Sequence, residues 1–116
     1  MRILIHGGFF SESSQSKATK EKKQKALLNI LDLGKSYLKN HSAIETVIYT
    51  AALLEDDPLF NAGTGSQIQS DGKIRMSASL MNGTTHKFSG VINIQDVHRT
   101  NTNVIIVKIR TPIRRS

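Results

Sequence analysis

The sequence predicts a domain of the α+β class, and three observations support this. A helical pattern of apolar residues runs over residues 18–38, and a second one begins after Ser42. Beyond Pro58 the pattern changes to an alternation of apolar and polar residues, which is typical of antiparallel strands. One chain of 116 residues with helices followed by strands favours a single domain with one core.

The N-terminal third predicts a strand and a long helix. Residues 2–6 combine β-branched residues and leucine before a pair of glycines, which indicates a short buried strand. Residues 18–38 place apolar side chains at helical spacing, although Gly34 interrupts the pattern. The apolar positions of this helix are Ala26, Leu27, Leu28, Ile30, Leu31, Tyr37 and Leu38.

The second helix has start and stop signals of its own. Ser42 with Glu45 three residues later forms a capping box. Pro58 cannot continue a helix and disfavours helical geometry in the residue before it, so the helix should end within residues 55–57. Its expected buried stripe consists of Ile44, Val47, Ile48 and Ala51, with Leu54 close to it.

The remaining sequence predicts antiparallel strands. Residues 66–69 and 73–80 are expected to pair as a hairpin around the turn Ser70-Asp71-Gly72. Asn82-Gly83 marks another turn, which precedes a strand over residues 88–94, and residues 104–109 are compatible with one more. Within residues 73–80 the side chains of one buried face should be Ile74, Met76, Ala78 and Leu80.

Composition narrows the class of protein. The absence of cysteine excludes disulfides, thiolate metal sites and a cysteine nucleophile, and it fits a reducing compartment. No apolar run is long enough for a secretory signal or a membrane span, so we expect a cytoplasmic protein without a membrane partner.

The net charge of +7 comes mainly from lysines within residues 17–25 and from basic residues within 99–115. A solvated helix face is the favoured interpretation of the first cluster. Binding of nucleic acid is a minor alternative, because no RNA-binding aromatic pattern, basic zipper or zinc spacing accompanies these residues. We therefore expect no nucleic-acid partner.

The glycine-rich loop after the second helix holds the main candidate residues. Asn61 could hold a water or orient a substrate group, or it could close its own loop. Thr64 has no adjacent base, so we do not expect a nucleophile there. The carboxylates of Glu55, Asp56 and Asp57 could bind a cation, although a solvated acidic turn is favoured for three acids at a helix C-terminus.

Two further features are weaker. His6-Gly7-Gly8 follows the expected first strand, where glycine lets a backbone approach another group closely, but a simple tight turn explains it equally well. The four histidines show no metal-ligand spacing, and we expect structural or exposed roles for them; they are His6, His41, His86 and His98.

Taken together, the motifs resemble the plant-type (type 2) asparaginase/isoaspartyl peptidase family, whose members are N-terminal-nucleophile hydrolases. The motifs, in chain order, are His6-Gly7-Gly8, Leu54-Glu-Asp-Asp-Pro-Leu-Phe-Asn-Ala-Gly-Thr-Gly65, Asp71-Gly72, Met76-Ser-Ala-Ser-Leu-Met-Asn-Gly83 and Ser89-Gly-Val91. The resemblance covers residues 1–96. It implies the N-terminal part of a four-layer αββα sandwich, with two helices and a mainly antiparallel sheet. It also implies hydrolysis of the asparagine side-chain amide and of β-aspartyl dipeptides by a threonine that self-cleavage exposes.

The same resemblance implies a structural sodium ion and no organic cofactor. The ion would be held by main-chain carbonyl oxygens, which suit a hard cation and replace the carboxylates as the expected ligands. Asn61 matches an asparagine beside the active-site water. By position, the carbonyls would be those of Leu54, Glu55, Asp57, Phe60, Ala62 and Thr64.

The chain also departs from the family pattern. Ser77 and Asn82 stand where the family usually has aspartate, and after about residue 96 the match fades into a basic segment. We therefore divide the chain into a partial domain, residues 1–96, and a divergent tail, residues 97–116.

The family's catalytic threonine would lie beyond these 116 residues, so no catalytic residue is expected in the chain, and it should be inactive alone. A truncated product, altered from Val97 onward, is the favoured interpretation. The alternative is a non-catalytic interaction or binding module that self-associates through an exposed sheet.

Overall fold

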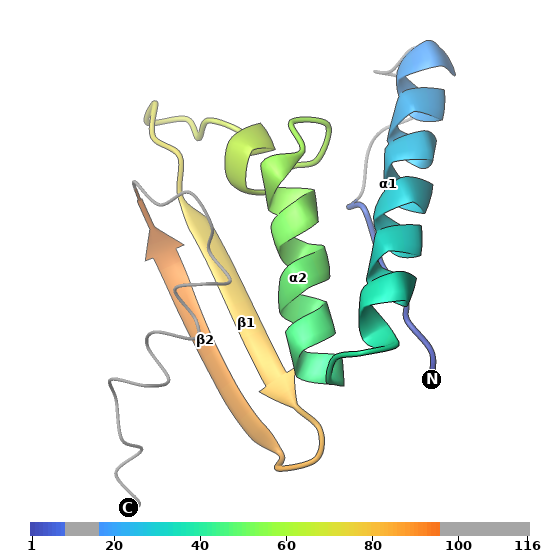
Figure 1. Cartoon of the computed structure of the whole chain (residues 1–116). Helices are drawn as coiled ribbons and strands as arrows, with labels where there is room; N and C mark the ends of the chain where they lie inside the picture. The colour runs from blue at the N-terminus through green and yellow to red at the C-terminus, as the bar shows by residue number, and fades with distance from the viewer. Residues whose placement is uncertain (9–16, 96–116) are drawn as a thin grey trace, which may run out of the picture.

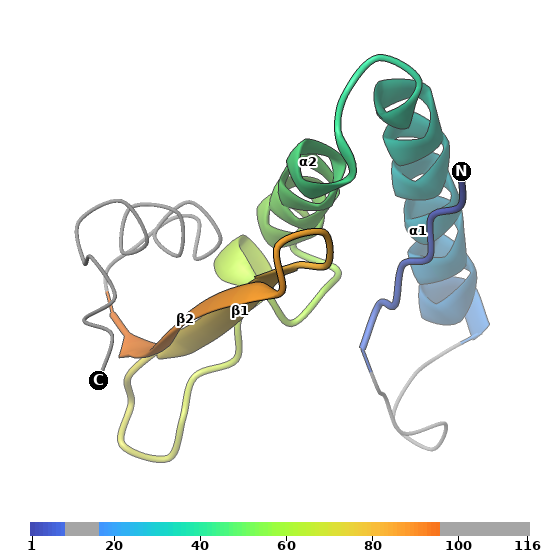
Figure 2. The ribbon, with the colours of Figure 1, turned by 90° about the horizontal axis from the view of Figure 1, so that it is seen from below.

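The computed structural model describes residues 1–8 and 17–95 of the chain. Figures 1 and 2 show helix α2 between helix α1 and a two-stranded sheet, so the predicted α+β class is confirmed. The elements are α1 (Lys17–Leu38), α2 (Ala43–Asp56), the 3-10 turn η2 (Gly63–Gly65), β1 (Met76–Asn82) and β2 (Lys87–Ile94). The two helices agree with their predicted ranges to within a residue at most ends.

The two helices cross closely because α1 carries a glycine at the contact. Gly34 is buried, and a Cβ at this position would lie 2.9 Å from the Thr50 hydroxyl oxygen and 2.9 Å from Ile3 Cδ1. The glycine that interrupts the apolar pattern of α1 therefore lets α2 and the N-terminal segment pack directly against the helix backbone.

The capping box of α2 forms as predicted. The Ser42 hydroxyl accepts a hydrogen bond from the Glu45 backbone N–H at 3.2 Å, and the Glu45 carboxylate accepts one from the Ser42 N–H at 2.8 Å. These bonds lower the pKa of Glu45, with the backbone bond from Ser42 as the largest cause and nearby His41 as a smaller one.

The buried stripe of α2 differs from the predicted one. Thr46 and Thr50 are buried, whereas Val47 is 52% exposed. Each threonine hydroxyl donates to the carbonyl four residues earlier, to Ser42 at 2.9 Å and to Thr46 at 2.7 Å. Because these bonds satisfy the hydroxyls, the threonines can occupy a buried face that the apolar pattern assigned to other positions.

Three aromatic rings stack at the corner between the helices. Tyr37 stacks on His41 with ring centroids 3.6 Å apart and on Tyr49 with centroids 4.1 Å apart. One His41 ring nitrogen also lies 2.9 Å from the Tyr37 carbonyl oxygen. The corner is thus defined by ring stacking as well as by the helix cap.

The predicted strand at residues 2–6 does not form. Residues 1–8 run alongside α1 without strand pairing, and Leu4 is 93% exposed (Figure 1). A strand needs a neighbouring strand for its backbone groups, and the described part of the chain provides none beside this segment.

The sheet is an antiparallel hairpin of β1 and β2, joined at Asn82–Lys87. The alternation predicted for residues 73–80 is confirmed within β1, where Met76, Ala78 and Leu80 are less exposed than the residues between them. It is wrong at Ile74, which precedes β1 and is 41% exposed, whereas the neighbouring Arg75 is half-buried. A register shift near Ser77 is accompanied by a positive φ of 58° at Asn93, whose N–H donates to the Ser77 hydroxyl at 3.2 Å. This irregularity has the character of a β-bulge.

The predicted hairpin between residues 66–69 and 73–80 is only partly correct. The turn is present, since the Gly72 N–H donates to the Gln69 carbonyl and the Gln69 N–H to the Lys73 carbonyl, both at 2.9 Å. Residues 66–69 are nevertheless not a strand, and β1 begins only at Met76. β1 pairs with the later strand instead, where the Asn82–Gly83 turn was also predicted.

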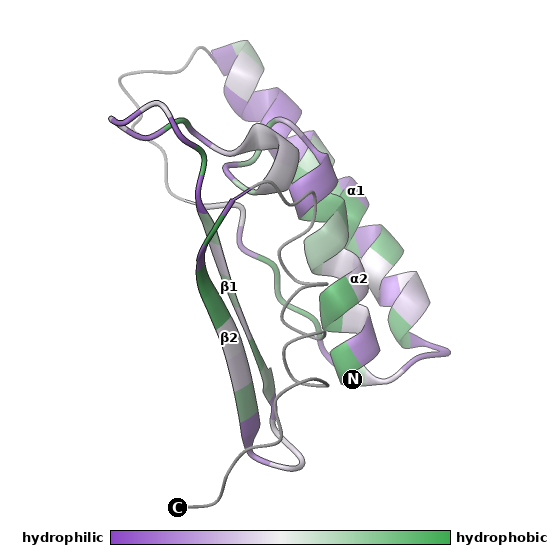
Figure 3. Cartoon of the chain, turned by 90° about the vertical axis from the view of Figure 1, so that its left-hand side faces the viewer, coloured by the Kyte–Doolittle hydropathy of each residue, from purple (hydrophilic) through white to green (hydrophobic). Residues whose placement is uncertain are grey.

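The described core is small, and some apolar surface is exposed. Its buried apolar side chains are Ile30, Leu38, Phe60 and Leu80. On the hairpin, Met81, Phe88 and Ile92 are 61%, 64% and 83% exposed. Figure 3 shows polar residues dominating the first turns of α1, where the lysines cluster. Among the described residues, we find no helix whose length and apolarity would suit a bilayer. The divergent tail, residues 97–116, and the expected strand at 104–109 lie outside the described residues.

Candidate functional site

The candidate site is the loop that follows α2. The helix ends where the Asp57 backbone becomes extended, as Pro58 predicts, and the Asp57 N–H donates to the Leu54 carbonyl at 3.4 Å. The Asp57 carboxylate then accepts the Leu59 N–H at 2.9 Å, and the Asp57 carbonyl accepts the Phe60 N–H at 3.2 Å. Asp57 therefore uses its side chain to shape the turn.

Two glycines allow the loop to fold back on itself. Gly63 has a φ of +51°, and a Cβ there would overlap the carbonyl oxygen of Glu55. A Cβ at Gly65 would overlap the Phe60 carbonyl oxygen and lie 2.7 Å from that of Pro58. The second half of the loop thus lies directly against main-chain carbonyls of the first half, an approach that only glycine permits.

The expected cation ligands can be tested against this geometry. The carbonyls of Leu54, Asp57, Phe60 and Ala62 each accept one backbone hydrogen bond, at 3.4, 3.2, 2.9 and 3.1 Å respectively. A carbonyl oxygen has two lone pairs, so each keeps acceptor capacity for a cation. Main-chain oxygens are also the type of donor that suits a hard cation.

The acidic side chains before the loop are not arranged as a metal site. Glu55 is buried, with 5% of its surface exposed, whereas Asp56 is exposed. Within residues 1–8 and 17–95, no group of three or more histidine, aspartate or glutamate side chains is placed to hold a metal ion.

Asn61 closes its own loop. Its side-chain oxygen accepts the backbone N–H of Gln67 at 2.9 Å, which spans six residues of chain. This bond occupies one lone pair of the oxygen, and the N–H donors of the exposed amide group take no part in it. The sequence left open whether Asn61 closes the loop or faces a ligand, and the hydrogen bond leaves room for both.

The N-terminal glycine motif contacts this loop. A Cβ at Gly7 would lie 3.0 Å from Phe60 Cε1 and 3.4 Å from Leu27 Cδ1. The ring of Phe60 is 5% exposed, so Gly7 helps to cover it. Two motifs that are more than 50 residues apart in the sequence are thus brought together, with glycine allowing the close approach.

Thr64 lies in η2 and is exposed. In the described part of the chain, no hydrogen bond joins its hydroxyl to a histidine or a carboxylate. The geometry therefore provides it with no general base, in agreement with its exclusion as a nucleophile.

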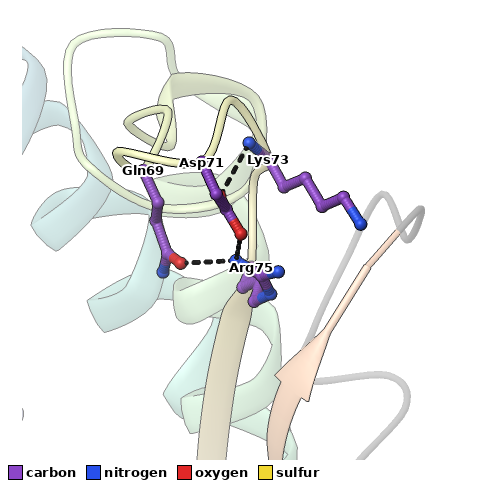
Figure 4. Close-up of polar contacts among 4 residues, drawn as sticks. All are labelled: Gln69, Asp71, Lys73 and Arg75. Atoms are coloured by element: carbon purple, nitrogen blue, oxygen red, sulfur yellow. Dashed lines mark hydrogen bonds and ion pairs between the residues drawn. The ribbon is translucent and has the colours of Figure 1, made fainter.

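An open pocket of about 460 Å³ adjoins the loop. Its lining includes Glu55, Asn61, Gly63, Gln67, Arg75 and Ser77. Arg75 donates through Nη1 to the Gln69 side-chain oxygen at 2.9 Å and forms an ion pair with Asp71 at 2.6 Å (Figure 4). In the sequence, Arg75 was only a solvent-facing member of an alternating strand, and no local signal marks it as part of a pocket.

Comparison with known proteins points to one family. The family model described as Asparaginase matches residues 1–103. An isoaspartyl peptidase/L-asparaginase of Nostoc sp. is 42% identical over 96 residues, which are 83% of this chain and 30% of the relative. A relative of the same name from Bos taurus is 40% identical over 82 residues, or 70% of this chain and 26% of the relative.

A plant-type L-asparaginase of Pyrococcus furiosus is 38% identical over 97 residues, which are 82% of this chain and 30% of the relative. The chain therefore spans about 30% of the length of the curated relatives that it matches.

Proposed function

Because the chain belongs to the asparaginase family, we propose that it forms the N-terminal part of an enzyme that hydrolyses the asparagine side-chain amide and β-aspartyl peptides. The observation that carries this proposal is the loop after α2, which folds as a closed unit and presents Asn61 beside a polar pocket.

We further propose that the loop holds a sodium ion through its main-chain carbonyls. Closed by Gly63 and Gly65, the loop orders several carbonyl oxygens without using a carboxylate cluster. The ion would neutralise the partial negative charge of these oxygens and fix the loop that carries Asn61. The expected ligands remain the carbonyls of Leu54, Glu55, Asp57, Phe60, Ala62 and Thr64.

The role proposed for Asn61 follows from its hydrogen bond. With the oxygen held by the Gln67 N–H, the amide N–H groups are oriented to donate to a water or to a substrate oxygen. The nucleophile, by family resemblance a threonine with a free α-amino group, is not among these 116 residues. By themselves the residues therefore supply the scaffold and a supporting donor, but no covalent catalyst.

A chimera tests this proposal. The chain is fused to the part of the Nostoc relative that lies beyond the matched region. The assay measures ammonia released from asparagine and aspartate released from a β-aspartyl dipeptide. We expect the folded chimera to hydrolyse both, Asn61→Ala to lower the rate at least tenfold, and Lys73→Met to leave it unchanged. The 116 residues alone should release neither product. A folded but inactive chimera, or activity of the chain alone, would contradict the proposal.

A second candidate role is supported by the exposed hairpin. Met81, Phe88 and Ile92 place three large apolar side chains in solvent, which favours association with a covering chain. On this reading the isolated chain self-associates, and sedimentation velocity should show dimers or larger species that Phe88→Ser reduces. If sedimentation velocity shows only monomer at about 100 µM, this second candidate role is contradicted.

A further inference from the structure

The turn that joins β1 to β2 holds an Asn-Gly pair, which lies outside the candidate site (Figure 1). Of the asparagines in the sequence, Asn82 is the one that precedes a glycine. We propose that Asn82 is a site of spontaneous deamidation, at which the main-chain nitrogen of Gly83 displaces ammonia from the side-chain amide. The folded turn assists the reaction, which needs water but no enzyme or cofactor.

The side chain of Asn82 is folded back toward the peptide unit that would attack it. Its Oδ1 accepts the backbone N–H of Thr84 at 3.0 Å and that of Thr85 at 3.3 Å. The ring closed by the first of these bonds contains both Asn82 Cγ and the Gly83 nitrogen, so the bond confines the two reacting atoms to one compact turn. Groups held together in this way react faster than the same groups in a freely moving chain.

The same two N–H groups also favour the reaction electrostatically. When a nitrogen adds to Cγ of the amide, negative charge develops on Oδ1. Donors that already point at this oxygen stabilise the charge as it forms, as in an oxyanion hole built from main-chain N–H groups. Thr84 and Thr85 therefore activate the Asn82 amide through their backbone rather than through their hydroxyls.

The attacking nitrogen is accessible to solvent. Gly83 is exposed, and a Cβ at this position would meet no atom within 4 Å. Within residues 1–8 and 17–95, no backbone acceptor is found for the Gly83 N–H. Hydroxide can therefore remove this proton, and no side chain on residue 83 obstructs the approach of the nitrogen to Asn82 Cγ.

The reaction has two steps and consumes one water. In the first, the deprotonated Gly83 nitrogen forms a bond to Asn82 Cγ, the Cγ–Nδ2 bond breaks, and Nδ2 takes up a proton from water and leaves as ammonia. The product is a cyclic succinimide. In the second step, water opens the succinimide at one of its two carbonyl carbons. Opening at Cγ gives aspartate at position 82, whereas opening at the main-chain carbonyl carbon gives isoaspartate, in which the main chain runs through Cβ and Cγ.

The Asp71-Gly72 pair shows by contrast what protects such a sequence. Asp71 Oδ1 accepts the Lys73 N–H at 3.1 Å, which is the same type of bond as at Asn82. The Gly72 N–H, however, donates to the Gln69 carbonyl at 2.9 Å, and Asp71 Oδ2 is paired with Arg75 at 2.6 Å. The nitrogen is thus engaged, and a carboxylate paired with a cation is a poor electrophile. We expect Asp71 to stay unmodified in the folded chain.

The two products should affect the hairpin differently. Asn82 is paired with Lys87 at the end of the sheet. Aspartate at position 82 would place a carboxylate opposite this lysine, and cross-strand pairs of opposite charge are favourable. Isoaspartate would lengthen the main chain by one methylene group, so the pair with Lys87 would be lost. The end of the hairpin should therefore open only in the isoaspartate form.

The test is mass spectrometry of the full chain after incubation in mildly alkaline buffer, with and without guanidinium chloride. Trypsin cuts after Arg75 and Lys87, so residues 76–87 are released as one peptide, in which the amide, aspartate and isoaspartate forms can be separated. We expect Asn82 to lose its amide at least as fast in the folded chain as in denaturant. A slower loss in the folded chain would overturn the proposal, because the turn would then protect the amide.

The same digests contain the internal control. Asp71 should form isoaspartate in denaturant and at least fivefold more slowly in the folded chain, where its glycine N–H is engaged. Equal rates at Asp71 in the two states would also overturn the proposal, because the hydrogen bonds of the turn would then not determine reactivity.

Variants identify the attacking nitrogen. Gly83→Ala should slow the loss of the Asn82 amide at least fivefold, because the methyl group hinders the approach to Cγ, while the open space around position 83 accommodates it. Thr85→Ser is the matched control, since it keeps the backbone N–H that donates to Oδ1, and its rate should stay within twofold of the wild type. If Gly83→Ala reacts as fast as the wild type, Gly83 is not the nucleophile and the proposal is wrong.

Hydrogen exchange tests the two bonds to Oδ1 directly. The backbone amides of Thr84 and Thr85 should exchange more slowly in the wild type than in Asn82→Ala, which removes their acceptor. Equal exchange in the two proteins would mean that the bonds do not form in solution, and the proposed assistance by the turn would be refuted.

Discussion

Gly63 lies directly against the carbonyl oxygen of Glu55, with its backbone in the left-handed region at a φ of +51°. The contact joins the last turn of α2 to the second half of the loop. It is the point at which the loop closes, and any side chain at position 63 would disturb both the conformation and the contact.

Gly63→Ala should therefore destabilise the chain by about 1–3 kcal/mol, through backbone strain and displacement of the Glu55 carbonyl. Urea unfolding measures the change. Gly83→Ala is the control, because a Cβ there has no neighbour within 4 Å. If both variants lose the same amount, the close approach at Gly63 is not what stabilises the loop.

Replacing sodium with tetramethylammonium at equal ionic strength should lower the stability of the chain. A cation that binds only the folded loop, at ten times its dissociation constant, stabilises by about 1.4 kcal/mol. Thermal unfolding in the two salts measures this effect, and Gly63→Ala should abolish the difference. Identical melting curves of the wild type in both salts would argue against a sodium-binding loop.

Gly34→Ala should destabilise the helix pair even though alanine is the better helix former. The propensity gain is about 1 kcal/mol, but the new methyl group would lie 2.9 Å from both the Thr50 hydroxyl and Ile3 Cδ1. We expect a net loss of about 1 kcal/mol, because overpacking at a contact of this kind costs about 1–3 kcal/mol.

Thr50→Ala provides the double-mutant cycle for this contact. If the close approach is the cause, the two substitutions should be coupled, with Gly34→Ala costing less in the Thr50→Ala background. Ser36→Ala, at an exposed position of the same helix, should be neutral or slightly stabilising. If the stability losses of Gly34→Ala and Thr50→Ala are additive, the Thr50 side chain is not what clashes with the new methyl group.

The capping box should make part of the stability depend on pH. The Glu45 pKa is lowered in the folded chain, mainly by the backbone hydrogen bond from Ser42. A carboxyl group with a lowered folded pKa stabilises above its unfolded pKa, about 4.3 for glutamate, and this contribution is lost as the pH falls through the folded value.

Glu45→Gln should therefore reduce the melting temperature at pH 7, and its difference from the wild type should narrow as the pH falls below about 4. Asp32→Asn, which removes an exposed carboxylate from α1, is the control. A difference that stays constant with pH would show that the carboxylate does not act through the cap.

Local signals predicted the helices well. Ser42, Glu45 and Pro58 act on their own backbone neighbours, so the start and end of α2 could be inferred from spacing alone. The alternation was also correct within β1, because one face of that strand is more buried than the other, but it failed at Ile74, where the strand has not yet begun. The resemblance to the asparaginase family, carried mainly by the segment from Leu54 to Gly65, is confirmed by the comparisons.

Features that depend on distant partners could not be predicted. The run at residues 2–6 has strand composition, but it lies beside α1 rather than beside a strand. Thr50 is buried against Gly34 of the other helix, and a helical pattern of apolar residues does not contain that information. The Arg75 pocket likewise depends on how the Asn61 loop and the β1 turn meet.

The corner between the helices also has a consequence for the order of folding. Tyr37, His41 and Tyr49 stack within a span of 13 residues, and the α2 cap lies inside that span. Contacts between residues so close in sequence cost little loop-closure entropy. We therefore expect the helical hairpin to form early and the contact of Gly7 with Phe60 to form late. Pulse-labelled hydrogen exchange should protect the amides of α2 before those of β1, and Tyr49→Ala should slow that first phase. The loop that carries Asn61 would then close onto a helix pair that is already in place.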